Sequence, residues 1–429
     1  MQEKSTVPAS SAERQMRHTL ALVLAGGRGS RLKELTRWRA KPALPFGGKY
    51  RIIDFVLSNC VNSGIRRIGV LTQYAPHSLI RHLQYGWNFL RHEIGEFVAV
   101  LPASQDGAQG EQGWYCGTAD AIYQNIDMIA RYCPGHVFVL AGDHVYTMDY
   151  GRMLMAHLAS GAELTVGCIE VPRESARAFG VMSVDAQGRV EHFLEKPADP
   201  PGLPGRPQRS LVSMGIYVFD AQVLLDEVSR DHDDPHSSHD FGADVLPGMI
   251  ARGARVFAYP FVNQAGRPDY WRDVGTIAAY WEANMDLCAI EPALNLYDAD
   301  WPIWTYQPQR PPAKFAFDED RRRGMALDAL VADGVVLSGA SVRRCIVSTD
   351  CFLHSYARVE DSILLPQVEI GRHCRIRRAI IDRGCVLPPG TEIGYDVEHD
   401  RERFCVDPDS GIVVVTPVML GRTFPLVAK

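Results

Sequence analysis

The 429-residue sequence lacks the features that would place it in a membrane or in an oxidising compartment. No apolar run approaches the roughly 20 residues that a membrane-spanning helix needs. Residues 1–18 contain no apolar stretch typical of a signal peptide. The ten cysteines include no Cys-x-x-Cys pair, which argues against a zinc site or a disulfide framework. We therefore expect a soluble, cytoplasmic protein with reduced thiols.

The chain also lacks an excess of positive charge, because its formal net charge is -6. This balance argues against general attraction to nucleic acid or to a membrane surface. Basic residues are nevertheless concentrated between Arg28 and Arg51, where eight Lys and Arg accompany a single acid, Glu34. The concentration predicts a local anion site.

Short apolar runs alternate with amphipathic stretches up to about residue 290. The runs predict strands, and "DAIYQNIDMIARY" and "YGRMLMAHLAS" have the spacing of helices. This alternation predicts an α/β domain over residues 19–300, built on a Rossmann-like, mostly parallel sheet. Ligands of such sheets bind beyond the carboxyl ends of the strands. The predicted strands are residues 19–27, 66–74, 136–144, 163–171 and 211–220.

The C-terminal part has a regular repeat, in which aliphatic residues recur in steps of five or six along the chain. Neither a helix nor a single strand generates such steps. Three successive steps make one turn of a triangular coil. They predict a left-handed parallel β-helix over residues 331–429, with one aliphatic per side pointing inward. Residues 301–330 are then a linker, and residues 1–18 a disordered arm. The aliphatics are Val336, Val342, Val347, Leu353, Val359, Leu364, Ile370, Ile376, Ile381, Leu387 and Ile393.

The glycine-rich segment after residue 24 matches neither common phosphate-binding motif. "GGKY" lacks the Ser or Thr that ends a P-loop, and Leu32 takes the place of the third glycine of a dinucleotide fingerprint. Its glycines still allow backbone N–H groups to approach an anion closely. From charge alone, an exposed basic loop explains the cluster equally well. The cradle residues are Gly26, Gly27 and Gly29, and the cations that follow are Arg31 and Lys41.

At this point the sequence resembles a known family. "LAGGRGSRL" and "KPALPFGGKYRIIDF" are similar to the nucleotide loop of sugar-phosphate nucleotidylyltransferases. The longer match, through "WYCGTADAIYQN", "LAGDHVY", "AFGVM", "FLEKP", "SMGIYVFD", "SSHDFG", "YWRDVGT" and "WPI", resembles the bacterial ADP-glucose pyrophosphorylases, or glucose-1-phosphate adenylyltransferases. The resemblance implies transfer of AMP from ATP to α-D-glucose 1-phosphate, with release of pyrophosphate, in glycogen or α-glucan synthesis.

The resemblance also implies roles for individual residues. Arg31, Lys41 and Asp143 would be catalytic, with the two cations holding the triphosphate. Magnesium, a hard cation that prefers carboxylate oxygens, would be held by Asp143 and Asp273. The implied substrate contacts are Gly26, Gly27, Gly29, Tyr115, Gly117, Gly180, Glu195, Lys196 and Ser213.

Members of this family are allosteric homotetramers, so we expect metabolite effectors and a homotetramer here. Trp38 and Pro45 stand where relatives have a basic residue and a histidine. We therefore expect fructose 6-phosphate or pyruvate, and not fructose 1,6-bisphosphate, to activate. AMP, ADP or phosphate would inhibit. The implied allosteric residues are Trp38, Arg39, Arg51, Arg131, Gln73 and Trp114.

Three alternatives stay open. The chain could use another base or sugar, such as UTP or mannose 1-phosphate, or it could be a catalytically silent regulatory subunit. Hexapeptide coils also build acyltransferases, for which His354 and His373 are the candidate bases. Both lie in ordinary coil positions, which favours a scaffolding and oligomerising role for the β-helix.

Overall fold

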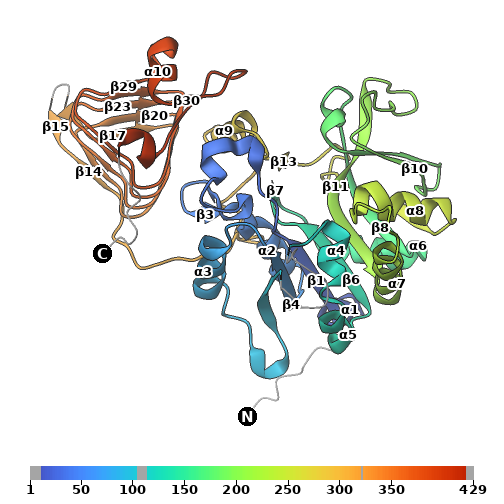
Figure 1. Cartoon of the computed structure of the whole chain (residues 1–429). Coiled ribbons are helices and arrows are strands. Elements are labelled where there is room, and N and C mark those ends of the chain that lie inside the picture. The colour runs from blue at the N-terminus through green and yellow to red at the C-terminus, as the bar shows by residue number, and fades with distance from the viewer. Residues whose placement is uncertain (1–10, 104–113, 320–321, 422–429) are drawn as a thin grey trace.

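The computed structural model describes residues 11–103, 114–319 and 322–421. An α/β domain and a triangular β-helix lie side by side (Figure 1). Among the helices in the described part of the chain, none is long and apolar enough to cross a membrane.

The α/β domain is built on a nine-stranded sheet with the order β10-β9-β11-β6-β1-β4-β5, in which β8 pairs with β11 and β12. Strands β6, β1, β4 and β5 are parallel, and β11 is antiparallel to β6. The five strands expected from the sequence are confirmed as β1, β4, β6, β8 and β11. The strands are β1 (Thr19–Leu24), β4 (Arg67–Thr72), β5 (Phe97–Pro102), β6 (His136–Ala141), β8 (Leu164–Pro172), β9 (Gly180–Val184), β10 (Val190–Glu195), β11 (Arg209–Asp220) and β12 (Val256–Pro260).

Helices cover both faces of this sheet, so its central strands are apolar on both sides. In β1, Ala21 and Val23 join one core cluster, whereas Leu20 and Leu22 join the cluster on the opposite face. The helices are α1 (Ser11–Arg17), α2 (Ile52–Asn62), α3 (His77–Gly86), α4 (Thr118–Tyr123), α5 (Ile126–Tyr132), α6 (Tyr150–Ser160), α7 (Ala221–His232), α8 (Leu246–Ala251) and α9 (Ile277–Asp286).

The structure corrects two expectations, one about a helix and one about the N-terminal arm. The stretch 120–132 forms two helices, because the backbone at Asn125 is not helical and the Asn125 side chain donates to the Ala121 carbonyl. The disordered arm expected over residues 1–18 does not include residues 11–17, which form α1 and bury Met16 in the core. Residues 1–10 lie outside the described part of the chain.

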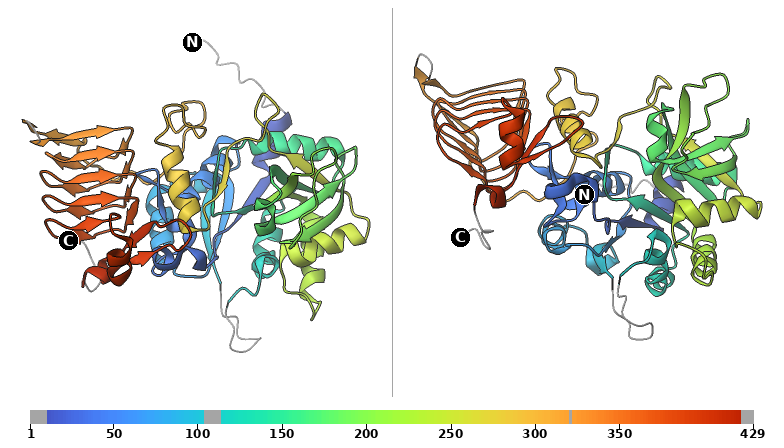
Figure 2. Two further views of the ribbon diagram at one scale, coloured as in Figure 1. Left: turned by 90° about the horizontal axis from the view of Figure 1, so that it is seen from above. Right: turned by 45° about the horizontal axis from the view of Figure 1, so that its top comes forward.

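The C-terminal domain consists of coils stacked into three flat faces (Figure 2). The first face contains β14 (Lys314–Ala316), β19 (Val336–Ser338), β22 (Phe352–Leu353), β25 (Glu369–Ile370) and β28 (Val386–Leu387). The second contains β17 (Met325–Leu327), β20 (Ser341–Arg343), β23 (Arg358–Glu360), β26 (Arg375–Arg377) and β29 (Glu392–Ile393). The third contains β18 (Leu330–Val331), β21 (Ile346–Val347), β24 (Ile363–Leu364), β27 (Ala379–Ile381), β31 (Val413–Val415) and β30 (Cys405–Val406).

Ten of the eleven predicted inward aliphatics are buried, and the exception is Val336. Its neighbour Leu337 points inward instead and pairs with Leu353 in the next coil. This coil is therefore one residue shorter than the regular repeat. The first coil also begins at Lys314, within the segment predicted as a linker. After α10 (Val397–Arg403), strand β31 adds to β27 and extends the third face.

One apolar cluster joins the two domains, with Phe46 and Trp281 on one side and Ile346, Ile363 and Val414 on the other. The Trp281 indole N–H donates to the Asp361 carbonyl at 2.9 Å. The domain boundary is therefore a packed interface.

Candidate active site

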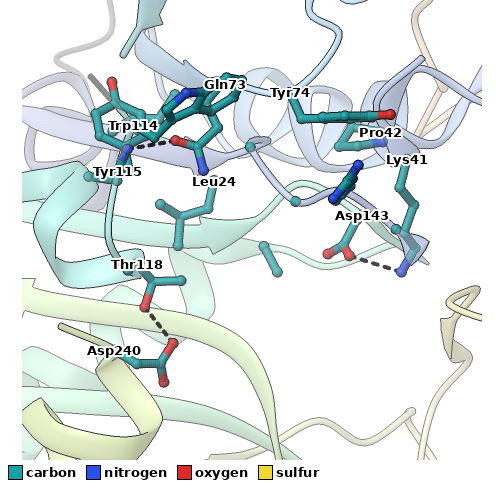
Figure 3. A pocket seen from close by; sticks show the side chains of 18 of the residues that line it. Leu24, Lys41, Pro42, Gln73, Tyr74, Trp114, Tyr115, Thr118, Asp143 and Asp240 are labelled. Carbon is teal, nitrogen blue, oxygen red and sulfur yellow. Dashed lines mark hydrogen bonds and ion pairs between the residues drawn. The ribbon is translucent and has the colours of Figure 1, made fainter. Parts of the chain in front are cut away.

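A cavity of about 690 Å³ opens at the carboxyl ends of β1, β4 and β6 (Figure 3). This is the edge at which open α/β sheets bind ligands. The structure brings together here many of the residues expected from the sequence. Those that line the cavity are Gly26, Gly27, Gly29, Lys41, Gln73, Trp114, Tyr115, Gly117 and Asp143.

The glycine loop turns at Gly29, whose φ of 63° lies in the left-handed region that favours glycine. A Cβ at this position would lie 3.0 Å from the Cβ of Lys41. The Gly29 carbonyl accepts hydrogen bonds from the Leu32 N–H and the Thr36 hydroxyl. At Gly27 a Cβ would meet nothing within 4 Å. The turn therefore requires glycine at position 29, and the space beside Gly27 is open.

Lys41 lies between two carboxylates in the wall of the cavity. Its Nζ is 2.9 Å from Asp143 Oδ2 and 2.7 Å from Asp273 Oδ1, and its side chain is 5% exposed. Asp273 arrives through a two-stranded ribbon of β7 (His144–Tyr146) and β13 (Trp271–Asp273). The guanidinium of Arg31 adds a further charge, 3.5 Å from Asp273 Oδ2. The four predicted charges therefore form one cluster.

The charges of this cluster set each other's ionisation. Burial opposes protonation of Lys41, but Asp143 and Asp273 outweigh that effect and raise the pKa of Lys41 above its ordinary value. Burial also opposes ionisation of Asp143, yet Lys41 and His144 hold the pKa of Asp143 far below its usual range. Lys41 is therefore a fixed cation and Asp143 a fixed anion at neutral pH.

The two carboxylates have the chemistry of a divalent-metal site. One ligand atom from each of Asp143, His144 and Asp273 lies within 4.8 Å of the others. His144 Nδ1 donates to the Met214 carbonyl, which directs Nε2 toward both carboxylates, at 3.6 and 3.9 Å. Hard oxygen donors suit magnesium, and Asp143 and Asp273 supply them. His144 was not expected from the sequence, although it directly follows Asp143.

The opposite wall of the cavity is held together by contacts between segments that are distant in sequence. The side-chain oxygen of Gln73, directly after β4, accepts a hydrogen bond from the Tyr115 N–H at 2.7 Å. At Gly117 a Cβ would lie 2.1 Å from the His239 carbonyl oxygen, so this glycine is required by close approach of two chain segments. The hydroxyl of Thr118 donates to Asp240 and fixes the same junction (Figure 3).

The remaining predicted substrate contacts lie on β9, β10 and β11 or, for Lys196, directly after β10, outside the lining of this cavity. Gly180 pairs with Glu195, and a Cβ on Gly180 would lie 2.3 Å from the Phe193 ring. Lys196 donates to Glu195 and is 64% exposed. Ser213 is buried, and its oxygen lies 3.3 Å from the Tyr217 hydroxyl. These positions form a second group beyond the cavity, in which Lys196 is exposed and Gly180 and Ser213 are buried.

Comparison with known proteins connects this arrangement to a family. A family model described as nucleotidyl transferase matches residues 20–290, and one described as GlmU-like, C-terminal hexapeptide matches residues 311–415. The glucose-1-phosphate adenylyltransferase of Hydrogenovibrio crunogenus is 60% identical over 412 residues, covering 96% of this chain and 97% of that protein. That of Methylococcus capsulatus is 56% identical over 423 residues, covering 98% of this chain and 99% of that protein. The chain belongs to the glucose-1-phosphate adenylyltransferase family.

Nucleotidyl transferases of this kind generally use a divalent metal, in agreement with the two carboxylates beside Lys41. The hexapeptide match agrees with a left-handed β-helix and begins before residue 331, as the first coil does.

A second cavity of about 560 Å³ lies where the nucleotidyl transferase domain meets the β-helix. Arg51, predicted as an allosteric residue, lines it and donates to the carbonyl and hydroxyl oxygens of Ser78, both at 2.8 Å. Burial lowers the pKa of Arg51 to about 10, and nearby Arg39 and Arg383 add to the effect. Pro45 also lines this cavity. Sequence reasoning missed its other cations, which are Lys49, Arg81, Arg310 and Arg383.

The other predicted allosteric residues are dispersed. Arg39 is paired with Asp382 of the β-helix at 2.7 and 2.8 Å. Trp38 is half exposed, with the Arg37 guanidinium over its ring. Arg131 is exposed on α5, which lies far from the β-helix in Figure 1. Within one chain, Arg131 is therefore not brought together with Arg39 and Arg51.

The acyltransferase alternative loses support from the surroundings of its two histidines. His354 Nε2 is paired with Glu369 at 2.9 Å, and the His373 ring stacks on Tyr356. Both are surface contacts between neighbouring coils, and neither residue lines the two cavities described here.

Proposed function

We propose that this chain catalyses, in the cytoplasm, the transfer of AMP from ATP to α-D-glucose 1-phosphate, giving ADP-glucose and pyrophosphate. The observation that carries the proposal is Lys41 held between Asp143 and Asp273 beside the glycine loop. Relatives up to 60% identical over nearly the whole chain carry the name of this activity. The reaction would supply ADP-glucose for glycogen or a related α-glucan.

In this proposal the chain positions phosphates and neutralises charge. A phosphate oxygen of glucose 1-phosphate attacks the α-phosphorus of ATP in line, and the bond from that phosphorus to pyrophosphate breaks. The glycine loop offers N–H groups, and Arg31 and Lys41 stabilise the negative charge that develops on pyrophosphate. Magnesium, when held by Asp143 and Asp273, would neutralise further phosphate charge.

The group beyond the cavity would bind the sugar phosphate. Lys196 is exposed and its ammonium reaches Glu195, so the pair offers a cation for the phosphate and a carboxylate for sugar hydroxyls. Gly180 and Ser213 lie on neighbouring strands of the same sheet. Gly117, in the cavity wall, would contact the base through backbone groups, and Tyr115 would contact the product or the sugar phosphate.

We propose that the second cavity is the effector site. Arg51, Arg81 and Arg383 face a space enclosed by both domains, so an anion bound there would contact both. The absence of a basic side chain at Trp38 favours effectors with a single anionic group, fructose 6-phosphate or pyruvate. AMP, ADP or phosphate would inhibit at the same cations.

We further propose that the chain forms a homotetramer. Four exposed aromatic side chains lie in contacting pairs, one of which lines the second cavity, and such a group is typical of an association surface. Ring centroids are 5.6 Å apart in one pair and 5.9 Å in the other. The pairs are Tyr85 with Tyr306, and Phe89 with Trp304.

The test of the activity is pyrophosphate release with magnesium and glucose 1-phosphate, run with ATP, UTP, GTP and dTTP in turn. We expect turnover that is selective for ATP. Selectivity for UTP, or for mannose 1-phosphate over glucose 1-phosphate, would replace the substrate assignment. No turnover from a folded oligomer with any pair would support the silent-subunit alternative.

The effector site is tested by Arg383→Ala, with Arg377→Ala on the exposed face of β26 as the matched control. We expect R383A to raise the fructose 6-phosphate concentration needed for half-maximal activation by at least tenfold, because it removes a cation from the cavity wall. R377A should leave that concentration unchanged. Equal responses of the two variants would place the effector elsewhere, and strong activation by fructose 1,6-bisphosphate would contradict the role given to Trp38.

A further inference from the structure

A cluster of two histidines and an aspartate lies at the opposite end of β6 from the cavity. His136 begins β6, and Asp220 ends β11 directly opposite it in the antiparallel pair. His157 comes from the last turn of α6. β6 spans six residues, so at about 3.3 Å per residue the cluster lies roughly 20 Å from the catalytic carboxylates. It does not belong to the site described above.

The spacing of the three side chains is that of ligands around one metal ion. His136 Nε2 is 3.4 Å and His157 Nε2 is 3.5 Å from the same atom, Asp220 Oδ1. One ligand atom from each residue lies within 4.8 Å of the others. Zinc bonds of about 2.0–2.1 Å in tetrahedral geometry place neighbouring ligands about 3.4 Å apart. A hydrogen bond between these groups would be shorter, near 2.9 Å.

A buried histidine nitrogen of this cluster lacks a partner. His157 is 1% exposed, and its Nε2 has no hydrogen-bond partner among the described residues. His157 Nδ1 lies 2.9 Å from the Thr165 hydroxyl. If Nδ1 carries the proton and donates to Thr165, the lone pair on Nε2 faces a carboxylate oxygen, an arrangement that a cation between them would stabilise.

The types of ligand also suit a transition metal, because imidazole nitrogen is a common ligand of zinc. Two nitrogens and one carboxylate oxygen match zinc better than magnesium, which prefers oxygen alone.

We propose that His136, His157 and Asp220 form a structural site for a transition-metal dication, with Zn²⁺ as the ion that fits the ligand set. By binding all three residues, the ion joins α6 and the end of β11 to the start of β6. Asp220 is 44% exposed, which leaves a path for the ion and a position for a water ligand. Cysteine spacing argued against a zinc site, but these three ligands come from separate elements and only the fold brings them together.

The test is titration of the chelator-treated full chain with Co²⁺, which reports tetrahedral coordination by its visible absorption, followed by competition with Zn²⁺. We expect one equivalent to bind, with Zn²⁺ displacing Co²⁺ and raising the thermal midpoint by several degrees. Asp220→Asn and His157→Gln should each lose the absorption band and the thermal shift. Because D220N changes a half-exposed side chain, it keeps the test valid if H157Q does not fold.

The matched control is Asp143→Asn, which removes a carboxylate from the other cluster of possible ligands. D143N should keep the band and the Zn²⁺-dependent thermal shift. Loss of the band in D143N with retention in D220N would place the metal at the catalytic carboxylates and overturn the proposal. Failure of the unaltered chain to bind Co²⁺ or Zn²⁺ would also overturn it.

Discussion

At the scale of single residues, Lys41 is the centre of the charged cluster that we propose to be catalytic. It is nearly fully buried and contacts two carboxylates that are far apart in the sequence. The pair Asp143 and Asp273 would repel each other without a cation between them. Lys41 supplies that charge, so it stabilises the close approach of the two carboxylates.

Asp143→Asn tests this organisation because it removes one negative charge at almost constant volume. We expect pyrophosphate release to fall roughly 10²–10³-fold, with an unchanged circular dichroism spectrum and elution volume. Asp199→Asn is the control, since Asp199 is an exposed partner of Arg173 and does not line the cavity. Activity of D143N within a few-fold of the unaltered enzyme would remove Asp143 from the catalytic machinery.

The same substitution gives a pH-dependent stability difference. The pKa of Asp143 is lower in the folded chain than in the unfolded chain, so ionisation of this group favours folding above its ordinary pKa of about 3.9. That contribution is lost as the pH falls through the lower, folded-state value. We expect the urea midpoint of the unaltered chain to exceed that of D143N at pH 7, and the difference to shrink between pH 5 and pH 3. A difference independent of pH would contradict the pairing with Lys41.

At the scale of elements, the junction between α4 and the segment at His239 closes one wall of the cavity. Gly117 precedes α4, and its backbone lies against the His239 carbonyl. The Ala119 N–H donates to that same carbonyl at 2.8 Å. The junction leaves no room for a side chain, and it joins two segments that are distant in sequence.

Gly117→Ala should therefore destabilise the fold. The new Cβ would lie 2.1 Å from a backbone oxygen, and the required backbone shift costs about 1–3 kcal/mol. We expect a lower thermal midpoint and a raised KM for ATP. Gly27→Ala is the matched control for stability, because a Cβ at Gly27 meets nothing within 4 Å. Equal midpoints for the two variants would contradict the close approach at Gly117.

At the scale of the whole molecule, a buried ion pair joins the two domains. Arg39 follows the glycine loop, and both oxygens of Asp382 on the β-helix accept hydrogen bonds from its guanidinium. Both side chains are largely buried. Burial lowers the pKa values of Arg51 and Arg383, and the nearby charge of Arg39 lowers them further. The pair thus lies beside the proposed effector cavity and joins the β-helix to the segment that follows the glycine loop.

Removal of one partner should separate the unfolding of the domains. Arg39→Met removes the ion-pair partner of the buried Asp382, which keeps only the hydrogen bond from the Arg383 N–H among the contacts described here, at a cost of about 3–5 kcal/mol. We expect scanning calorimetry to resolve two transitions where the unaltered chain gives one. Arg310→Met, which breaks a more exposed pair with Asp350, should cost about 1 kcal/mol or less and keep a single transition. A single, equally shifted transition in both variants would show that the apolar interface alone couples the domains.

Local patterns in the sequence were sufficient to predict several parts of this protein. The regular spacing of aliphatic residues reflects one coil packing on the next, so it predicts the β-helix without knowledge of distant contacts. The apolar runs predict five strands, because a strand buried on both faces must be apolar throughout. The glycine loop was also evident, since only glycine adopts the turn at Gly29 without strain.

Other features depend on contacts between distant residues, and only the tertiary structure decided them. Ribbon β7–β13 carries Asp273 to Asp143, and no local pattern encodes that pairing. Whether Val336 or Leu337 points into the β-helix depends on the neighbouring coil. Both residues are aliphatic, so the spacing in the sequence does not distinguish them. Arg383 reaches the second cavity from the β-helix, whereas Arg131 lies on a distant helix. Residues from separate elements meet only when the whole chain packs, so sequence reasoning finds the elements before it finds the site.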